Sequence, residues 1–332
     1  MNDSVIVLLL ASIVSQSVPL VLAVTGETLT ERAGVTNLSL DGTMMFGAMI
    51  AFLTALMLDP AFEADLLPVL AGFTAAALVG AFAALIIAWG SIRLRQDQVA
   101  IGFVLTLLLA DLANFLGQNY TRIPGPSVKH MPIPLLSDIP LIGPVLFGHD
   151  MLVYLTFVLV GVVWWWLYRT QPGLKMRGVG ERPESAFTRG VGVNSTRYLY
   201  SAIGGALVGM GGAAYSLSIK LGWSDNHILG IGWIALAIVI FGGWRPVRGA
   251  LGAVLYGAIK TLITYLQQSF PAVPVVLFNS LQWLLMLSVL LFVGSEGLKR
   301  LVDLSPKPLQ RVLNQALRVA PPEGLGKVFI KE

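Results

Sequence analysis

Three polar side chains share one face of an apolar segment of the chain. Asp111, Asn114 and Gln118 are spaced i, i+3 and i+7 within a segment at 100–119, a spacing that puts them on the same side of a helix. Asp111 lies near the middle of that segment. An ionisable group at such a depth is costly in lipid, so it should face water or a partner side chain.

A second polar face occurs on the apolar segment at 249–268. Lys260, Thr264 and Gln267 are similarly spaced, and Lys260 lies about as deep in its segment as Asp111 does in its own. Two hypotheses remain open at this point. The two faces line a hydrophilic path for a polar solute, or Asp111 and Lys260 form a structural ion pair between packed helices.

Two further polar groups are candidates for the lining of such a path. Asn279 and Gln282 are spaced i and i+3 on the apolar segment at 276–294. Thr36, Asn37 and Ser39 belong to a polar stretch between the first two apolar segments. Non-helical backbone at membrane depth persists only where it is buried in protein or lines a cavity, so these three can offer hydrogen bonds to a solute. Equally, the charged residues that precede them cap helix ends at the interface.

A basic segment at 169–197 carries six of the 22 Lys and Arg residues and separates two long apolar segments. Its middle predicts a short helix. Pro183 fits the first helical position, Glu184 suits the positive end and Arg189 the negative end. Ala186 and Phe187 provide a small apolar face, and a helix this short needs packing against a partner. A simple loop connector is the alternative interpretation.

Composition places these segments in a membrane protein. Hydrophobic residues make up 55% of the chain and charged residues 12%, about half the charged share of a soluble domain. The chain has no cysteine and only three histidines, so we expect no disulfide, no metal site and no cofactor. No Gly-x4-Gly-Lys-Ser/Thr pattern occurs; any ATPase that drives this chain is a separate polypeptide. The basic charge of the short loops fixes membrane orientation and indicates no nucleic-acid partner.

The sequence predicts an all-α, polytopic transmembrane helical bundle with about nine spans, one of them short or broken. The spans are expected at 5–24, 42–58, 68–89, 100–119, 150–168, 198–218, 230–243, 249–268 and 276–294. Most Lys and Arg residues fall in the segments at 90–99, 169–197, 244–248 and 295–332. Basic loops stay in the cytoplasm, so the N-terminus is predicted outside and the C-terminus inside.

Two domains are expected. Residues 1–304 form the transmembrane domain, and residues 305–332 form a cytoplasmic tail with a helical face at 309–317. The segment at 120–149 holds six prolines, which forbid a long regular helix and predict a compact external cap or a re-entrant loop.

A short internal echo links the two halves of the chain. The spacing Gly-x4-Gly-Ala recurs at 42–48 and 252–258, each time after a stretch expected to be irregular, at 25–41 and 242–248. Broken segments at corresponding places in two halves point to a transport pathway. The echo makes an internal repeat possible, and glycine's abundance in membrane helices is the competing explanation.

Three long stretches resemble one known family. Residues 30–48 read Thr-Glu-Arg-Ala-Gly-Val-Thr-Asn-Leu-Ser-Leu-Asp-Gly-Thr-Met-Met-Phe-Gly-Ala, residues 173–186 read Gly-Leu-Lys-Met-Arg-Gly-Val-Gly-Glu-Arg-Pro-Glu-Ser-Ala, and residues 232–246 read Gly-Trp-Ile-Ala-Leu-Ala-Ile-Val-Ile-Phe-Gly-Gly-Trp-Arg-Pro. They resemble inner-membrane permeases of ATP-binding-cassette (ABC) importers for branched-chain amino acids, ribose-type sugars and nucleosides. The nucleoside and simple-sugar subgroup is the most similar.

The resemblance implies a set of partners and a coupling site. The partners are a second permease, often a related but different chain, two cytoplasmic ATPase subunits, an extracytoplasmic solute-binding protein and membrane lipid. By this resemblance the short helix is the coupling helix seated in an ATPase groove. The residues that would carry the coupling are Arg182, Pro183, Glu184, Ala186, Phe187 and Arg189.

Two departures from the family pattern stand out. The chain has Ser39-Leu-Asp-Gly42 where the family often has Gly-Val-Glu-Gly, which weakens any carry-over of the solute. It has Glu181-Arg-Pro-Glu184 where the family often has Glu-Asn-Pro-Glu, and Arg is a poorer N-cap than Asn. We therefore expect an importer permease for a nucleoside, purine-like or simple-sugar solute that does no covalent chemistry. A transporter driven by an ion gradient, with Asp111 as its coupling acid, is the alternative.

Overall fold

The computed structural model describes residues 3–59, 66–294, 306, 310 and 320–329. Across these ranges the chain is helical, and its β-structure is limited to three isolated bridges. The α-helices are α1 Asp3–Arg32, α2 Leu40–Leu58, α3 Leu67–Ile92, α4 Gln98–Gly117, α5 Met151–Arg169, α6 Gln171–Glu181, α7 Pro183–Thr188, α8 Val193–Ala214, α9 Ile231–Phe241, α10 Pro246–Ser269 and α11 Val275–Gly294. Three shorter turns are the 3₁₀ helix η1 Gln118–Tyr120 and the π-helices η2 Gly143–Phe147 and η3 Tyr215–Lys220.

The expected all-α membrane bundle is confirmed. Seven helices in the described part of the chain are long and apolar enough to cross a membrane, and two shorter apolar helices cover Ile231–Phe241 and Val275–Ser288. Each of the nine predicted segments therefore contains a helix. The short segment expected at 230–243 is α9, which has 11 residues and a length of about 16 Å, roughly half of a bilayer core.

The prediction of an irregular stretch at 25–41 is wrong for its first part. Helix α1 continues to Arg32, and only residues 33–39 are non-helical. The continued helix buries Glu27 and Glu31, two charges that suggested a loop. Glu27 Oε1 accepts a hydrogen bond from Asn37 N at 3.2 Å, and Glu31 accepts one from the Trp244 indole. Each carboxyl group thus has a hydrogen-bond donor that the fold brings to it, whereas Glu27 Oε2 is buried with no partner among the described residues.

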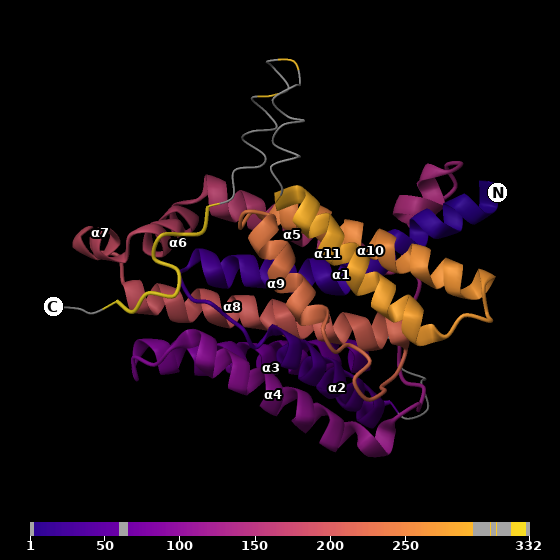
Figure 1. Ribbon diagram of the computed structural model, residues 1–332, viewed down its shortest axis with the longest axis horizontal. Coiled ribbons are helices and arrows are strands. Elements are labelled where there is room, and N and C mark those ends of the chain that lie inside the picture. The colour runs from indigo at the N-terminus through magenta and orange to yellow at the C-terminus, as the bar shows by residue number, and fades with distance from the viewer. Residues whose placement is uncertain (1–2, 60–65, 295–305, 307–309, 311–319, 330–332) are drawn as a thin grey trace.

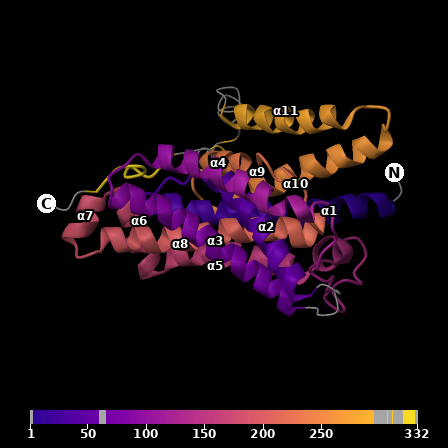
Figure 2. The same cartoon turned by 90° about the horizontal axis from the view of Figure 1, so that it is seen from below.

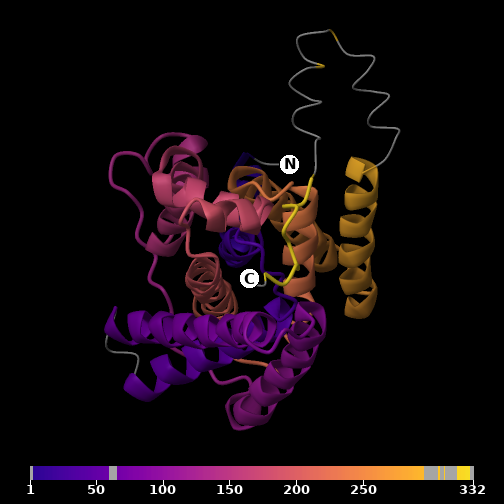
Figure 3. The ribbon, with the colours of Figure 1, turned by 90° about the vertical axis from the view of Figure 1, so that its left-hand side faces the viewer.

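Helix α1 runs through the middle of the bundle, where α5, α8, α9 and α10 pack around it (Figure 3). Helices α2, α3 and α4 form a neighbouring layer, with α8 between α1 and α3. The α3–α8 contact is close because small residues meet there. A Cβ added to Gly80 would lie 2.1 Å from the Gly205 carbonyl oxygen. The glycines at this contact thus serve packing within the chain.

The two ends of the bundle carry different structures (Figure 1). One end, which we call the α7 end, contains α6, α7, the end of α1 and the segment 320–329. At the other, the cap end, lie the start of α1 and the mostly non-helical segment 121–150. Helix α11 lies at the edge of the bundle against α10 and α9 (Figure 2). The tail helix expected at 309–317 falls mainly on residues outside the described part of the chain.

Candidate functional site

The start of α9 is buried and held by a carboxylate from another helix. Asp41, near the start of α2, accepts hydrogen bonds from Gly230 N at 2.7 Å and from Gly232 N at 2.9 Å through its Oδ1. Only 2% of Asp41 is exposed. The first N–H groups of a helix lack partners and carry partial positive charge. The carboxylate satisfies both needs, so α9 can begin inside the bundle.

The non-helical segment before α2 is tied down by the polar residues predicted to meet a solute. Thr36 N donates to the Gln98 side chain at 2.7 Å. Ser39 donates from both its N (3.0 Å) and its Oγ (2.7 Å) to Asn37 Oδ1. Asn37 and Ser39 are buried, and Thr36 is half-buried. The Thr36 bond holds the segment against α4, and the bond from Asn37 N to Glu27 holds it against α1, so the three residues shape the interior next to Asp41.

The polar face of α4 is only partly engaged inside the molecule. Asn114 donates to Asn226 Oδ1 at 2.8 Å and accepts from Asn226 N at 3.2 Å. Asp111 and Gln118 are exposed. The face therefore pairs with the segment 221–230, between η3 and α9, through one residue, and presents the other two outward.

The polar face of α10 also reaches the segment 221–230, through Tyr215 of η3. Lys260 Nζ lies 4.4 Å from the centre of the Tyr215 ring and 3.3 Å from its hydroxyl, a cation–π contact. The Tyr215 ring lies 5.4 Å from the ring of His227. Thr264 donates to the Lys260 carbonyl at 2.9 Å and is exposed; Gln267 is half-buried.

Asp111 and Lys260 form no ion pair, both residues being within the described ranges. Instead, each polar face reaches the segment 221–230, α4 through Asn226 and α10 through Tyr215 and His227. Asn279 and Gln282 lie on α11, but their side chains fall outside the described part of the structure.

His227 adds a titratable group that the sequence analysis missed. Its ring contacts Trp223 edge-on at 4.7 Å and shares a hydrogen bond with the Ser224 carbonyl. Burial, the largest effect, lowers the pKa of His227 to about 4, and the charges of Lys220 and Lys260 act in the same direction. The imidazole is therefore neutral near pH 7.

Asp41 and Trp244 were also missed as site residues. An acid at the start of an apolar segment is a signal that sequence reasoning can use. Its partners are invisible from the sequence because Gly230 lies 189 positions away. Trp244, in the turn between α9 and α10, accepts from Arg32 Nε at its carbonyl oxygen at 2.8 Å.

The short helix predicted in the basic segment is present as α7, with six residues. Pro183 is its first residue and is buried, and Ala186 packs against Val179 and Val193. Phe187 is 39% exposed. Glu184 and Arg189 are exposed at its two ends.

Arg182 is a poorer N-cap than Asn, so the sequence did not show what holds the start of α7. In the structure an ion pair lies next to it. Arg182 makes no side-chain cap to α7. Its Nε lies 3.3 Å from Glu323 Oε2 in the segment 320–329. The preceding residue, Glu181, lies 3.3 Å from Arg32 at the end of α1. The α6–α7 turn is thus joined to the helix that runs through the bundle centre.

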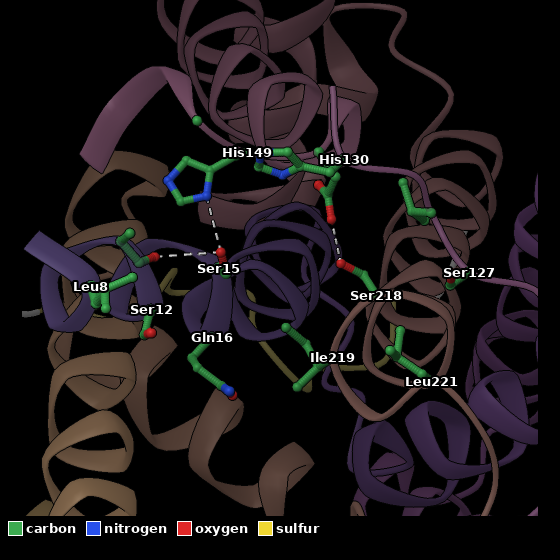
Figure 4. Close-up of a pocket in the computed structure, with 14 residues that line it drawn as sticks. Leu8, Ser12, Ser15, Gln16, Ser127, His130, His149, Ser218, Ile219 and Leu221 are labelled. Atoms are coloured by element: carbon green, nitrogen blue, oxygen red, sulfur yellow. Dashed lines mark hydrogen bonds between the residues drawn. The ribbon is translucent and has the colours of Figure 1, made fainter. Parts of the chain in front are cut away.

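A cavity of about 430 Å³ with both polar and apolar lining residues lies at the cap end (Figure 4). It is lined by the first half of α1, the cap and η3, with Ser12, Ser15 and Gln16 on one side. Ser15 Oγ lies 3.1 Å from His149 Nδ1, and Ser218 donates to Asp150 at 2.5 Å. The first contact joins the cap to α1 and the second joins it to η3, so the cavity walls are held by internal contacts.

Long apolar helices, a short interior helix and an exposed helix at one end are the features of a multi-pass membrane protein. A family model described as the permease component of branched-chain amino acid transport systems matches residues 9–294. The chain belongs to this family. As a permease component it is a transport subunit and not an enzyme.

Three relatives are similar over most of their length. The putative glucose ABC transporter permease protein TsgC13 of Haloferax volcanii is 36% identical over 258 residues, 76% of each chain. The nucleoside ABC transporter permease protein NupC of Lactococcus lactis is 33% identical over 262 residues, 77% of this chain and 81% of its own. The guanosine ABC transporter permease protein NupQ of Bacillus subtilis is 37% identical over 250 residues, 72% of this chain and 76% of its own.

Two of these organisms supply a second matching permease. TsgB13 of Haloferax volcanii is 25% identical over 304 residues, and NupB of Lactococcus lactis is 28% identical over 94 residues. An ABC transporter permease works with an ATPase and a solute-binding protein, so partners of these two kinds follow for this chain. No solved structure matches the chain significantly.

Proposed function

We propose that the chain is the permease subunit of an ABC importer that carries a nucleoside, purine-like or simple-sugar solute by alternating access. The relatives named for glucose, nucleosides and guanosine support this solute range. Two ATPase subunits at the α7 end and a solute-binding protein at the cap end complete the assembly. The second permease is a related, different chain, as the paired relatives of two organisms favour.

The observation that carries the proposal is the link from α7 to the interior. Helix α7 is short, exposed and placed between longer helices. Glu181, the last residue of α6 and two positions before α7, contacts Arg32, which also donates to the carbonyl oxygens of Gly243 (3.3 Å) and Trp244 (2.8 Å). A push on α7 therefore reaches both the end of α1 and the turn after α9.

The interior end of α9 is where the solute path is proposed. Asp41 fixes the start of α9, and the segments 33–39 and 221–230 approach it from two sides. Discontinuous helices of this kind mark solute sites in transporters. The lining residues we propose are Thr36, Asn37, Ser39, Asp111, Asn114, Gln118, Lys260, Thr264, Gln267, Asn279 and Gln282.

Orientation follows from charge. The basic segment around α7 belongs on the cytoplasmic side, which puts the C-terminus inside and the N-terminus outside. The ATPase then reaches α7 from the cytoplasm, and the cap at 121–150 faces the solute-binding protein.

The test is ATP-driven uptake of labelled guanosine and of labelled glucose into vesicles that contain the assembled transporter. Arg189→Glu should lower uptake by about tenfold or more, because a charge reversal at a protein interface opposes docking. Arg189→Lys is the matched control and should retain most uptake. Membrane insertion should be equal in both variants.

Unchanged uptake in the Arg189→Glu variant, with Phe187→Ala also unchanged, would remove the coupling role of α7. Uptake that persists without ATP and collapses with an uncoupler would instead establish a transporter driven by an ion gradient.

A further inference from the structure

The end of the chain lies across the α7 end as a strap, defined here as residues 321–329. Gly324 N donates to the Gly180 carbonyl at 2.8 Å, and Gly326 N donates to the Gly34 carbonyl at 3.2 Å. The strap thus bonds through its backbone to α6, one residue before α6 ends, and to the segment that follows α1. The strap therefore connects α6 with the segment that directly follows α1. Helix α6 and the end of α1 are the two elements through which a movement of α7 would reach the bundle interior.

A buried arginine holds the strap. Arg197, in the first turns of α8, is 1% exposed. Its guanidinium donates to the Lys327 carbonyl at 2.8 Å and to the Gly324 carbonyl at 3.3 Å. A buried charge without hydrogen-bond partners is costly. Both acceptors found for Arg197 in the described part of the chain belong to the strap. The strap is therefore an integral part of the structure at the α7 end.

The strap also extends the apolar surface of α7. The Phe329 ring lies 5.5 Å from the Phe187 ring, and Phe329 packs against Val179, Ala186 and Val193. Val328 is 38% exposed and Phe187 is 39% exposed. Helix α7 alone offers one outward apolar side chain, Phe187. Together with the strap it offers a continuous patch.

The strap lies beside α7 and leaves its outward side open. Ser185, Thr188 and Arg189 are exposed. In Figure 1 the strap, in yellow, runs past α6 towards the start of α8, and α7 projects beyond it. A segment that blocked docking would cover these residues.

We propose that the strap completes the surface that the ATPase subunit grips, with Phe329 and Val328 seated beside Phe187 in one apolar groove. This inference rests on the proposed function. Arg189 and Lys327 are exposed and lie at the rim of this surface. Arg182 is paired with Glu323, and Glu184 is an exposed acidic residue on an otherwise basic rim. The fitting partner surface is an apolar floor with acidic side chains opposite Arg189 and Lys327.

The first test measures how tightly the ATPase subunit binds the purified permease pair in detergent. Phe329→Ser should weaken binding by about tenfold or more, as loss of a central aromatic anchor does at protein interfaces. Leu174→Ser is the matched control, because Leu174 is 61% exposed on α6 and is absent from the apolar cluster that seats Phe329. It should bind normally. Equal binding by the two variants would overturn the inference.

The second test removes the strap by ending the chain after Ala320. Because this strands the Arg197 charge, the shortened chain is paired with Arg197→Met, and its melting temperature shows whether it folds. The folded double variant should lose ATPase binding by the same factor as Phe329→Ser or more. Binding that is unchanged or tighter would overturn the inference, and tighter binding would identify the strap as a plug.

The Arg189→Glu variant separates this inference from the proposed function. If it loses ATPase binding while Phe329→Ser binds normally, only the role of the strap fails. If both variants bind normally, the coupling role of α7 fails as well.

Discussion

Two short helices, α9 and α7, begin in different ways. Helix α9 begins in the interior, where buried Asp41 accepts hydrogen bonds from the N–H groups of Gly230 and Gly232. Helix α7 begins at the surface with no side-chain cap, next to an Arg182–Glu323 pair whose side chains are 71% and 63% exposed. The first junction is buried within the chain and the second is exposed.

This difference has an energetic meaning. Leaving a buried donor without its acceptor costs about 1–3 kcal/mol for each group. An exposed ion pair is worth about 0–1 kcal/mol. The α9 junction is therefore expected to stay fixed during transport, whereas the α7 junction can exchange its contacts for those of another subunit at little cost.

The largest expected effect is from Asp41→Ala. Two buried N–H groups lose their acceptor, so we expect a loss of about 2–6 kcal/mol of stability and loss of uptake. Thermal unfolding of the purified protein measures the first. Asp41→Asn is the control, because it keeps an oxygen at the same position and should lose less. An Asp41→Ala protein that melts like the wild type would break the comparison.

The smallest expected effect is from Glu323→Gln. It removes the charge partner of Arg182 but leaves the strap backbone in place, so the expected change is below about 0.5 kcal/mol. The same unfolding measurement detects it, and raising the salt concentration should reduce it further. A loss as large as that of Asp41→Ala would show that the α7 junction is as rigid as the interior one.

The sequence was most informative where the determinants are local. Helix α7 could be predicted because the residues that favour its two ends, Pro183, Glu184 and Arg189, are all near neighbours in the sequence. The apolar segments were equally visible. The end of α1 was misjudged because Glu27 and Glu31 looked like loop residues. The fold brings one hydrogen-bond donor to each of them, Asn37 N to Glu27 and the Trp244 indole to Glu31.

The parts of the site that could not be predicted depend on long separations in the chain. Asp41 meets Gly230 across 189 positions, and Arg197 meets Lys327 across 130. A polar face on α4 and another on α10 were expected from the sequence. Their meeting point was not, because the irregular segment 221–230 that connects to both has no periodic pattern.

The most direct test of the account uses the absence of cysteine in the chain. Single cysteines are introduced as Ser185→Cys on α7 and Leu135→Cys on the cap, where Leu135 is 85% exposed. A membrane-impermeant maleimide should label Leu135→Cys in right-side-out vesicles and Ser185→Cys in inside-out vesicles, and bound ATPase should protect Ser185→Cys. Labelling of Ser185→Cys from the outside, or labelling that ATPase leaves unchanged, would contradict the assignment of α7 as the helix through which an ATPase drives transport.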